Sequence, residues 1–531
     1  MQNLKPANVK SRWQAWLYSK GLLLLGICVL LVFSNGRWIL PLATWLAPVL
    51  ILRYFRTATK LWHALLWTWL ILVLTAPVIW LGLWPFPPQV ILQIAAIGSA
   101  ISLIPYLLDR FSIGRIGGVA QTLIFPVTAV ALEFLGSLRA QGAWGNIAYT
   151  QTENLALLQF ASLTGVWGIT FLILWLAPVL NNLWENGFTI PSSRRALLVY
   201  GSTLAGILLF GSLRLLFFQP SGETVRVASV TPPEFFDFAT PDDLQSFQRI
   251  MTKESIDPAV AESLREKLAG SFDTLFADTR REAQSGADLV VWPEGALISF
   301  DSDQDRELIE RAKQVAVDER IYLAVTIAMV PLNPEKLNEN RMLFIDPDGE
   351  VRDTYWKTYT VPVVEAPFAV QGSHRVALQE TPFGRIAGVI CADMDASRFL
   401  HDAGQKEADI LLAPSGDWPA IKSLHSRMSI MRAVEQGFSL VRPANHGLTL
   451  AADYQGRVLG RMDHYMTSDR RMSVSVPVKG TTTLYARTGD LFAWLCVVLS
   501  ALFLARLAQL FAGVRQKPFS DLEMQDNPGA V

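Results

Sequence analysis

Hydrophobic residues are distributed unevenly along this chain of 531 residues. Residues 21–218 carry successive apolar runs, residues 224–480 mix apolar and polar stretches, and residues 490–513 are apolar again. A helix that crosses a bilayer needs about 20 apolar residues, and the first part is too long and repetitive to be a signal peptide alone. The pattern predicts a polytopic α-helical membrane domain, a large extramembrane domain and a closing membrane helix.

We expect about seven membrane-spanning helices before the extramembrane domain and one after it. The expected spans lie near residues 20–34, 37–53, 61–83, 89–108, 117–136, 162–181, 197–217 and 490–512. The first two runs are short and could form a single hairpin, which would change the count. The expected domains are therefore residues 1–223, 224–480 and 481–531.

The loops between the apolar runs alternate in their content of Lys and Arg. Eleven such residues lie in the N-terminal tail and in the second, fourth and sixth loops, and two lie in the intervening loops. Cytoplasmic loops carry an excess of Lys and Arg. We therefore expect a cytoplasmic N-terminus, an extramembrane domain on the outer side, and a cytoplasmic C-terminal tail.

Residues 224–480 show short apolar runs that alternate with polar helical stretches. The expected strands lie at 225–230, 287–293, 321–330, 341–350, 384–390, 408–414 and 438–445, and the expected helices at 258–285 and 422–436. Several of these strands are almost continuously apolar, as strands are when both faces of a sheet are covered. The pattern predicts an α/β domain with helices on the outside.

Composition and charge exclude several classes of function. Hydrophobic residues make up 51% of the chain, and the formal net charge is -1 without a basic patch, which gives no support for a nucleic-acid partner. The three cysteines, Cys28, Cys391 and Cys496, form neither a disulfide framework nor a metal-binding spacing. The histidines are also scattered, so we expect no metal and no cofactor.

Three residues that could take part in catalysis are interpreted as standing at strand ends. Glu294 comes after "LVVWP", Lys357 lies in "YWKTYTVPVVE", and Cys391 follows "GRIAGVI". Side chains at strand ends of α/β folds can converge on one crevice. A thiol nucleophile, a carboxylate base and an ammonium group that stabilises an oxyanion would make an acyl-transfer site, with the Ala392 N–H as a second oxyanion donor.

Each of these residues also has a plainer interpretation when it is taken singly. A cysteine after an apolar strand is most often part of the core, a Glu after Trp–Pro can be an exposed turn residue, and a Lys in a loop is usually on the surface. Spacing alone leaves both interpretations open.

The motifs around these residues resemble those of a known superfamily. "VVWPEGA", "YWKTYTVPVVE" and "GVICADM" are similar to the Glu, Lys and Cys motifs of the nitrilase, or carbon–nitrogen hydrolase, superfamily. Together with the membrane helices, the chain resembles the apolipoprotein N-acyltransferase family of diderm bacteria. Three further stretches carry this resemblance: "ALEFLGSLRAQGAWGNIAY" (131–149), "HSRMSIMRAVEQGFSLVRPANHG" (425–447) and "TTTLYARTGD" (481–490).

The resemblance implies a nitrilase-like αββα sandwich in the periplasm, attached to the inner membrane. It implies that Cys391 is the nucleophile and thioester site, that Glu294 is the general base, and that Lys357 stabilises the oxyanion. Glu365 would be a second active-site Glu. The implied partners are a phospholipid acyl donor and the N-terminal amine of a diacylglyceryl-cysteine in a lipoprotein.

The sequence also departs from the family pattern close to the nucleophile. The family usually has Tyr–Glu after the Cys, whereas this chain has Ala392 and Asp393, and its arm between Glu365 and the nucleophile strand is short. Asp393 could replace the family Glu, so both residues are expected to border the site. Two alternatives stay open: a membrane-anchored amidase or acyltransferase for another amine with the same triad, and a non-catalytic binding domain.

Overall fold

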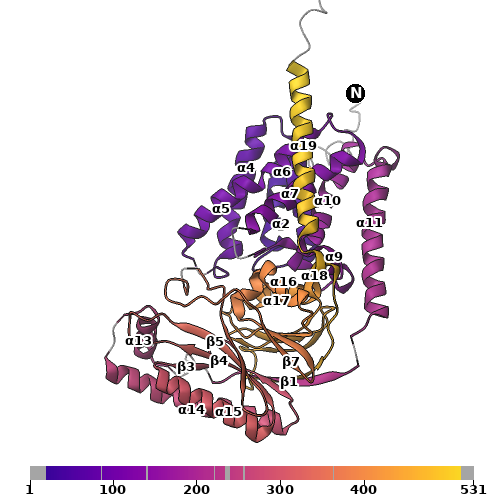
Figure 1. Cartoon of the computed structure of the whole chain (residues 1–531). Helices are drawn as coiled ribbons and strands as arrows, with labels where there is room; N and C mark the ends of the chain where they lie inside the picture. The colour runs from indigo at the N-terminus through magenta and orange to yellow at the C-terminus, as the bar shows by residue number, and fades with distance from the viewer. Residues whose placement is uncertain are drawn as a thin grey trace, which may run out of the picture.

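A membrane part built of helices and a layered α/β part make up the molecule (Figure 1). The computed structural model describes residues 20–84, 86–138, 142–220, 222–233, 239–254, 257–362 and 364–515. Within these ranges, six helical stretches are long and apolar enough to cross a membrane. They are α4 (Leu61–Trp80), α5 with α6 (Pro88–Ser102 and Ile104–Ser112), α7 (Gly118–Ser137), α10 (Val166–Glu185), α11 (Ile190–Phe217) and α19 (Leu491–Arg515).

The first two expected spans form a helical hairpin, α2 (Lys20–Ser34) and α3 (Pro41–Thr57). Their connection is fixed by the Leu40 N–H, which donates to the Phe33 carbonyl oxygen at 2.8 Å. The helices have 15 and 17 residues, which is shorter than the roughly 20 residues of a typical span. Ile27 on α2 packs with Leu52 on α3 in the apolar core of the bundle.

Two other membrane helices begin at residues different from those expected. The span expected at 162–181 begins at Val166, because Gly165 at φ +63° separates it from the short helix α9 (Ala161–Thr164). Helix α11 begins at Ile190 rather than near residue 197. The short elements η1 (Ile147–Gln151) and α8 (Leu155–Leu158) precede α9. Most of the basic N-terminal tail and the polar C-terminal tail lie outside the described residues.

The described residues of the extramembrane domain form two large β-sheets. The first has the strand order β15-β1-β2-β4-β5-β6, with β3 paired to β4, and the second has the order β14-β13-β11-β9-β8-β7. The strands of the first sheet are β1 (Thr224–Val230), β2 (Leu289–Val291), β3 (Leu297–Ser299), β4 (Tyr322–Met329), β5 (Glu339–Ile345), β6 (Val351–Trp356) and β15 (Arg471–Pro477). Those of the second sheet are β7 (Ala377–Thr381), β8 (Gly384–Gly388), β9 (Ile410–Leu412), β11 (Ser439–Arg442), β13 (Leu448–Ala452) and β14 (Val458–Asp463). Two short strands pair in parallel outside these sheets. They are β10 (Ser415–Gly416), which comes after β9 in the chain, and β12 (Ala444–Asn445), which comes after β11.

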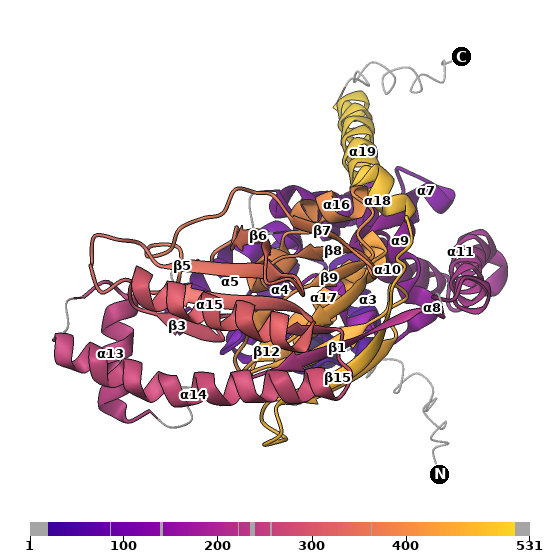
Figure 2. The same ribbon diagram turned by 60° about the horizontal axis from the view of Figure 1, so that its bottom comes forward.

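Each sheet is covered by helices on its outer face. Helices α14 (Pro258–Gln284) and α15 (Ser302–Glu319) cross in front of the first sheet when the domain is seen from below (Figure 2). Helix α13 (Pro241–Met251) lies beside them. Helices α16 (Ser397–Gln405) and α17 (Lys422–Gln436) lie between the second sheet and the membrane helices (Figure 1). The order of layers is therefore helix, sheet, sheet, helix.

The alternation of side chains along β2 explains this layering. Leu289 and Val291 point into the core shared by the two sheets, whereas Val290 between them packs with residues of α14 and α15. Successive side chains of a strand point to opposite faces, so both faces of β2 are buried and all three residues are apolar. The expected αββα sandwich beside a helical membrane domain is confirmed.

A buried polar cluster attaches the sandwich to the bundle. Arg432 on α17 contacts the Tyr149 hydroxyl of η1, and the Glu435 carboxylate accepts a hydrogen bond of 2.8 Å from the Val166 N–H at the start of α10. The side chains of Arg432 and Glu435 are both fully buried. Since a buried charge requires partners, these contacts fix the second sheet and its nucleophile loop above the membrane helices.

Candidate active site

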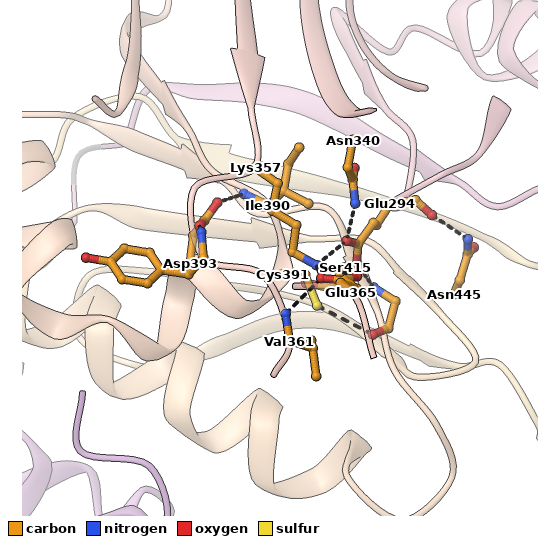
Figure 3. A network of polar contacts seen from close by, with 12 residues as sticks. Glu294, Asn340, Lys357, Val361, Glu365, Ile390, Cys391, Asp393, Ser415 and Asn445 are labelled. Atoms are coloured by element: carbon orange, nitrogen blue, oxygen red, sulfur yellow. Dashed lines mark hydrogen bonds and ion pairs between the residues drawn. The ribbon is translucent and has the colours of Figure 1, made fainter. Parts of the chain in front are cut away.

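Three loops at strand ends bring Glu294, Lys357 and Cys391 into one site between the sheets (Figure 3). Glu294 lies just after β2, Lys357 directly follows β6, and Cys391 opens the short helix η2 (Cys391–Asp395) after β8. The Lys357 Nζ lies 2.7 Å from Glu294 Oε1. The Cys391 Sγ lies 3.5 Å from the Gly416 carbonyl oxygen. The Gly416 N–H donates to Glu294 Oε2 at 2.7 Å. The three side chains therefore share one set of hydrogen bonds.

Two asparagines that the sequence did not single out as site residues hold Glu294. The Asn340 Nδ2 on β5 donates to Glu294 Oε1 at 2.7 Å, and the Asn445 Nδ2 on β12 donates to the Glu294 carbonyl oxygen at 2.8 Å. Since the Gly416 N–H donates to Oε2, each carboxylate oxygen of Glu294 has a fixed donor, and Asn445 holds its backbone. Asn445 lies in "ANHG", which belongs to a stretch used for the family resemblance, whereas no pattern in the sequence distinguishes Asn340.

Glu365 is the second carboxylate at Lys357. Its two oxygens lie 2.9 and 2.7 Å from the Lys357 Nζ, and the Val361 N–H donates to one of them at 2.9 Å. Lys357 is 1% exposed, and the Glu365 side chain is 25% exposed. The structure therefore places Glu365 on the more open side of the ammonium group, with Glu294 on the enclosed side.

The electrostatics of the site favour the charged forms of both Lys357 and Glu294. Burial by itself would lower the pKa of Lys357, but the charges of Glu294 and Glu365 raise that pKa well above its ordinary value. Burial would raise the pKa of Glu294, but the charge and hydrogen bond of Lys357, with hydrogen bonds from Cys391 and Asn340, lower it. The resting site therefore contains an ammonium group and a carboxylate that is free to accept a proton.

Cys391 lies in an unusual backbone conformation at the start of η2. Its φ is +48°, a left-handed value that is uncommon for residues other than glycine. The Cys391 N–H is held by the Pro414 carbonyl oxygen at 2.9 Å, and the residue is 4% exposed. Such strained positions concentrate at functional sites. Burial and the nearby Glu294 charge raise the pKa of the Cys391 thiol well above its usual value, so the resting thiol is protonated.

The two residues after Cys391 have different surroundings. Asp393 is fully buried, and its Oδ1 accepts hydrogen bonds from the Thr358 and Tyr359 N–H groups at 3.2 and 2.7 Å. Its Oδ2 accepts hydrogen bonds from the Tyr355 hydroxyl at 2.6 Å and from the Ile390 N–H at 2.9 Å. Asp393 thus ties the segment that follows Lys357 to the turn that carries Cys391.

Ala392 contributes no side-chain function to this turn. Within the part of the chain that the structure describes, no acceptor takes a hydrogen bond from its N–H. Because it directly follows Cys391, this N–H is available to an anion that forms next to Sγ. The sequence-predicted residues Glu294, Lys357, Glu365, Cys391, Ala392 and Asp393 thus all lie in one region of the structure.

A second buried charge cluster lies directly behind the nucleophile. Asp417 follows Gly416, and its Oδ1 lies 2.8 Å from His425 Nδ1 and 2.7 Å from an Arg442 nitrogen. The other ring nitrogen of His425 lies 3.4 Å from Asp395 at the end of η2. Burial and the Arg442 charge would lower the pKa of His425, but the two carboxylates raise it to about 9. No ligand or catalytic pattern in the sequence points to His425, and in the structure this residue is buried between the two carboxylates.

Two family models match the chain, one over each part. Residues 25–179 match the model described as apolipoprotein N-acyltransferase N-terminal domain, and residues 228–468 match the model described as carbon-nitrogen hydrolase. The first range covers most of the membrane helices. The second begins in β1 and covers the two sheets up to the start of β15.

Curated relatives span both parts. An apolipoprotein N-acyltransferase from Geobacter metallireducens is 26% identical over 436 residues, which covers 76% of this chain and 77% of the relative. One from Rhodopseudomonas palustris is 24% identical over 414 residues, with 71% and 72% covered. Among solved structures, an amidase from Nesterenkonia sp. is 18% identical, with a TM-score of 0.38, and covers 50% of this chain and 94% of its own.

Proposed function

The chain is a divergent member of the apolipoprotein N-acyltransferase family, and we propose that it moves an acyl chain from a phospholipid to a bacterial lipoprotein. The acceptor is the N-terminal amine of a diacylglyceryl-cysteine, and the acyl chain is carried as a thioester on Cys391. The observation that carries the proposal is the contact between Lys357 and Glu294 beside the Cys391 thiol. An amidase function is not favoured, because the relatives that match both domains are N-acyltransferases.

The first half-reaction forms the thioester. Glu294 accepts the thiol proton while Cys391 Sγ attacks the ester carbonyl carbon of the phospholipid. The Lys357 ammonium group and the Ala392 N–H stabilise the resulting oxyanion. When the tetrahedral intermediate collapses, the glycerol oxygen leaves and takes the proton from Glu294. The products are the acyl-thioester and a lysophospholipid with a free hydroxyl group.

The second half-reaction transfers the acyl chain to the amine. The amine nitrogen attacks the thioester carbon, and Glu294 accepts a proton from that nitrogen. The same two donors stabilise the second oxyanion. Collapse of this intermediate breaks the carbon–sulfur bond, and the proton on Glu294 returns to the sulfur. An amide and the resting thiol result, so atoms and charge balance over the cycle.

The resting charges support this division of roles. A protonated thiol needs a base at the moment of attack, and the lowered pKa of Glu294 keeps that base ionised. Both Glu294 and Glu365 contact the Lys357 ammonium group. When Glu294 becomes protonated, the Glu365 carboxylate at 2.7 Å still balances the charge of Lys357. We assign Glu365 this supporting role. We assign Asp393 the role of a positioning residue that keeps the Lys357 segment in register with the nucleophile turn.

The protein is a multi-pass membrane protein of the bacterial inner membrane. For its topology we propose that α2 and α3 each cross the bilayer, which gives seven spans before the sandwich and one after it. The N-terminus and the C-terminal tail would then be cytoplasmic, in agreement with the bias of Lys and Arg in the loops. The active site would face the periplasm beside the outer leaflet, where both lipid substrates are within reach.

A reporter lipoprotein tests the proposal directly. The reporter is expressed in bacteria depleted of their own N-acyltransferase, with or without this chain, and its N-terminal peptide is weighed by mass spectrometry. We expect one additional acyl group when the chain is present and none with Cys391→Ala. An unchanged acyl count with a well-expressed, membrane-inserted chain would refute the lipoprotein acceptor.

A further inference from the structure

A cavity of about 400 Å³ lies inside the membrane domain, apart from the residues of the active site. It is bounded by helices α2, α3, α4, α5, α6, α7 and α10 and by η1, and most of its lining is apolar, with Leu31, Ile51, Ile101, Phe125 and Ala129 among the lining residues. The volume is near the lower end of the range for pockets that hold small molecules, about 300–1,000 Å³. The apolar lining of the cavity suits a hydrocarbon chain.

The cavity extends along the helix axes. Phe125, Ala129 and Glu133 line it from α7 at intervals of four residues, so they lie on one face of that helix. Eight residues of α-helix span about 12 Å. Across the cavity, Thr44, Pro48 and Ile51 on α3 give a parallel stripe with similar spacing. The lining therefore forms an elongated apolar channel with Glu133 towards the end of α7 that leads to η1.

Glu133 supplies an unsatisfied acceptor at this end. The Asn146 Nδ2 donates to Glu133 Oε1 at 2.8 Å, and among the described residues no donor reaches the other carboxylate oxygen. The hydroxyl groups of Ser34 and Thr44, which also line the cavity, already donate to backbone carbonyl oxygens at 3.0 and 2.6 Å. An ionisable residue inside a membrane domain is costly and generally marks a functional site. The cavity thus combines an apolar channel with one free acceptor.

We propose that this cavity binds the lysophospholipid released by the first half-reaction, an inference that rests on the proposed function. A lysophospholipid has one acyl chain, which fits the channel, and a free glycerol hydroxyl, which can donate to the open oxygen of Glu133. A diacyl phospholipid has two chains, and its glycerol ester groups contain only acceptors. The free glycerol hydroxyl and the single chain are therefore the two features by which the cavity can distinguish the product from the donor lipid.

The position of the cavity relative to the nucleophile supports this assignment. The segment 142–146 carries Asn146, which holds Glu133, and at its other end Gly142 packs against the backbone of Asp395. Asp395 closes the short helix that begins with Cys391. The polar end of the cavity and the nucleophile turn thus contact the same short segment. Binding of the product there removes it from the thioester, which it would otherwise deacylate in the reverse reaction.

Photocrosslinking with the full-length protein tests the inference. The probe is a lysophosphatidylethanolamine with a diazirine in its acyl chain, and the comparison probe is the diacyl lipid with the same diazirine chain. Both are applied to the Cys391→Ala protein in lipid nanodiscs, so that no acyl transfer takes place, and the labelled peptides are mapped by mass spectrometry. We expect the lysophospholipid to label the peptides of α3 and α7 at least about tenfold more strongly than the diacyl probe.

Two variants and two controls locate the site. Ala129→Phe fills the channel and should abolish this labelling, whereas Leu135→Phe, on an exposed part of the same helix, should not. In Glu133→Gln, if the amide oxygen keeps the hydrogen bond from Asn146, an NH2 group takes the place of the open oxygen. Labelling by the lysophospholipid should then weaken about tenfold, with no change for Glu153→Gln at the surface. If Ala129→Phe does not fold, Glu133→Gln and the peptide map still decide the question.

Equal labelling by the diacyl probe, labelling that avoids α3 and α7, or insensitivity to Glu133→Gln would each overturn the inference. Because the crosslinking is done without catalysis, it is independent of the reporter experiment. A chain that acylates the reporter but does not bind lysophospholipid in the cavity would contradict this inference alone. A chain that binds the probe but leaves the reporter unchanged would contradict the proposed function alone.

Discussion

Lys357 and Glu294 form a buried ion pair in which Nζ lies 2.7 Å from Oε1. The lysine is 1% exposed, so the pair lies away from solvent and cannot be a surface ion pair. Breaking such a pair is costly because it leaves an uncompensated charge. In the mechanism that we propose, Glu294 accepts protons and Lys357 stabilises an oxyanion, so the reaction requires both members of the pair.

Replacement of the base should stop the chemistry and preserve the site. Glu294→Gln keeps an oxygen that can accept the hydrogen bond from Lys357, but the amide cannot take a proton from the thiol. We expect the rate of acyl-thioester formation to fall by about 10²- to 10⁴-fold, measured with a radiolabelled phospholipid. Glu307→Gln, on an exposed face of α15, serves as the matched control. A Glu294→Gln protein with normal rates would exclude Glu294 as the base.

The three cysteines should differ completely in their importance. Cys391→Ala removes the sulfur that carries the acyl chain, so we expect neither an acyl-enzyme nor reporter acylation. Cys28→Ala and Cys496→Ala should retain both, because these residues lie in membrane helices α2 and α19. The acyl group on Cys391 should be released by hydroxylamine and detected by peptide mass spectrometry. Full activity of Cys391→Ala would rule out the thioester mechanism.

Asp393 should affect the rate of acyl-enzyme formation because it fixes the position of Lys357. Asp393→Ala removes the acceptor for the Tyr359 and Ile390 N–H groups, so the Lys357 segment can shift relative to Cys391. A displacement of about 1 Å can lower a catalytic rate about 100-fold, and we expect a loss of that order in acyl-enzyme formation. Asp393→Glu retains a carboxylate and should recover part of the rate. Loss of activity in Asp393→Ala that is fully explained by unfolding would argue against a positioning role.

The cluster around His425 should make stability depend on pH. Asp395 and Asp417 raise the folded-state pKa of His425 from 6.5 to about 9, so the stabilisation that it contributes is fully present below pH 6.5. It is lost as the pH rises through about 9. We expect the thermal midpoint of the wild-type protein to fall by a few degrees over this window. The groups that face His425 are Asp395, Asp417 and Arg442.

His425→Gln provides the comparison for this pH effect. The variant has no group at that position that titrates, so its midpoint should change less than that of the wild-type protein between pH 6.5 and 9. The measurement is thermal unfolding in detergent, followed by intrinsic fluorescence at several pH values. Parallel curves for the two proteins would show that His425 does not titrate in this range.

Much of the fold could be predicted because its signals are local. Helices α14 and α17 match the expected ranges closely, and the buried strands β1, β4 and β8 lie within apolar runs. Among the described residues, seven strands lie outside the expected ranges, namely β3, β6, β7, β10, β13, β14 and β15. The strand β14 has the sequence VLGRMD with only one buried residue, and β15 alternates Val with Ser. Strands with such a mixed pattern are defined by pairing with distant neighbours, which no local window contains.

The residues of the site also fall into two groups, those with a local signal in the sequence and those without one. Cys391 and Glu294 follow apolar strands, so their position at the strand ends could be inferred from the chain. Asn340 lies within β5 and contacts Glu294 only because β5 is next to β4 in the sheet. His425 lies on α17, which meets the nucleophile turn only in the tertiary structure. Contacts of this kind depend on the tertiary arrangement, and residue type alone did not indicate them.

The junction between the two domains should depend on Arg432. Its guanidinium group contacts Glu435 one turn along α17 and the Tyr149 hydroxyl of the membrane domain, and its side chain has no exposed surface. Arg432→Ala leaves the Glu435 carboxylate buried without its charge partner, and we expect a loss of about 3–5 kcal/mol in the free energy of unfolding. Tyr149→Phe removes one hydrogen bond and keeps the ring, so its cost should be about 1 kcal/mol. Unfolding in urea with the protein in mixed micelles measures both, and similar losses for the two variants would show that the ion pair does not stabilise the junction.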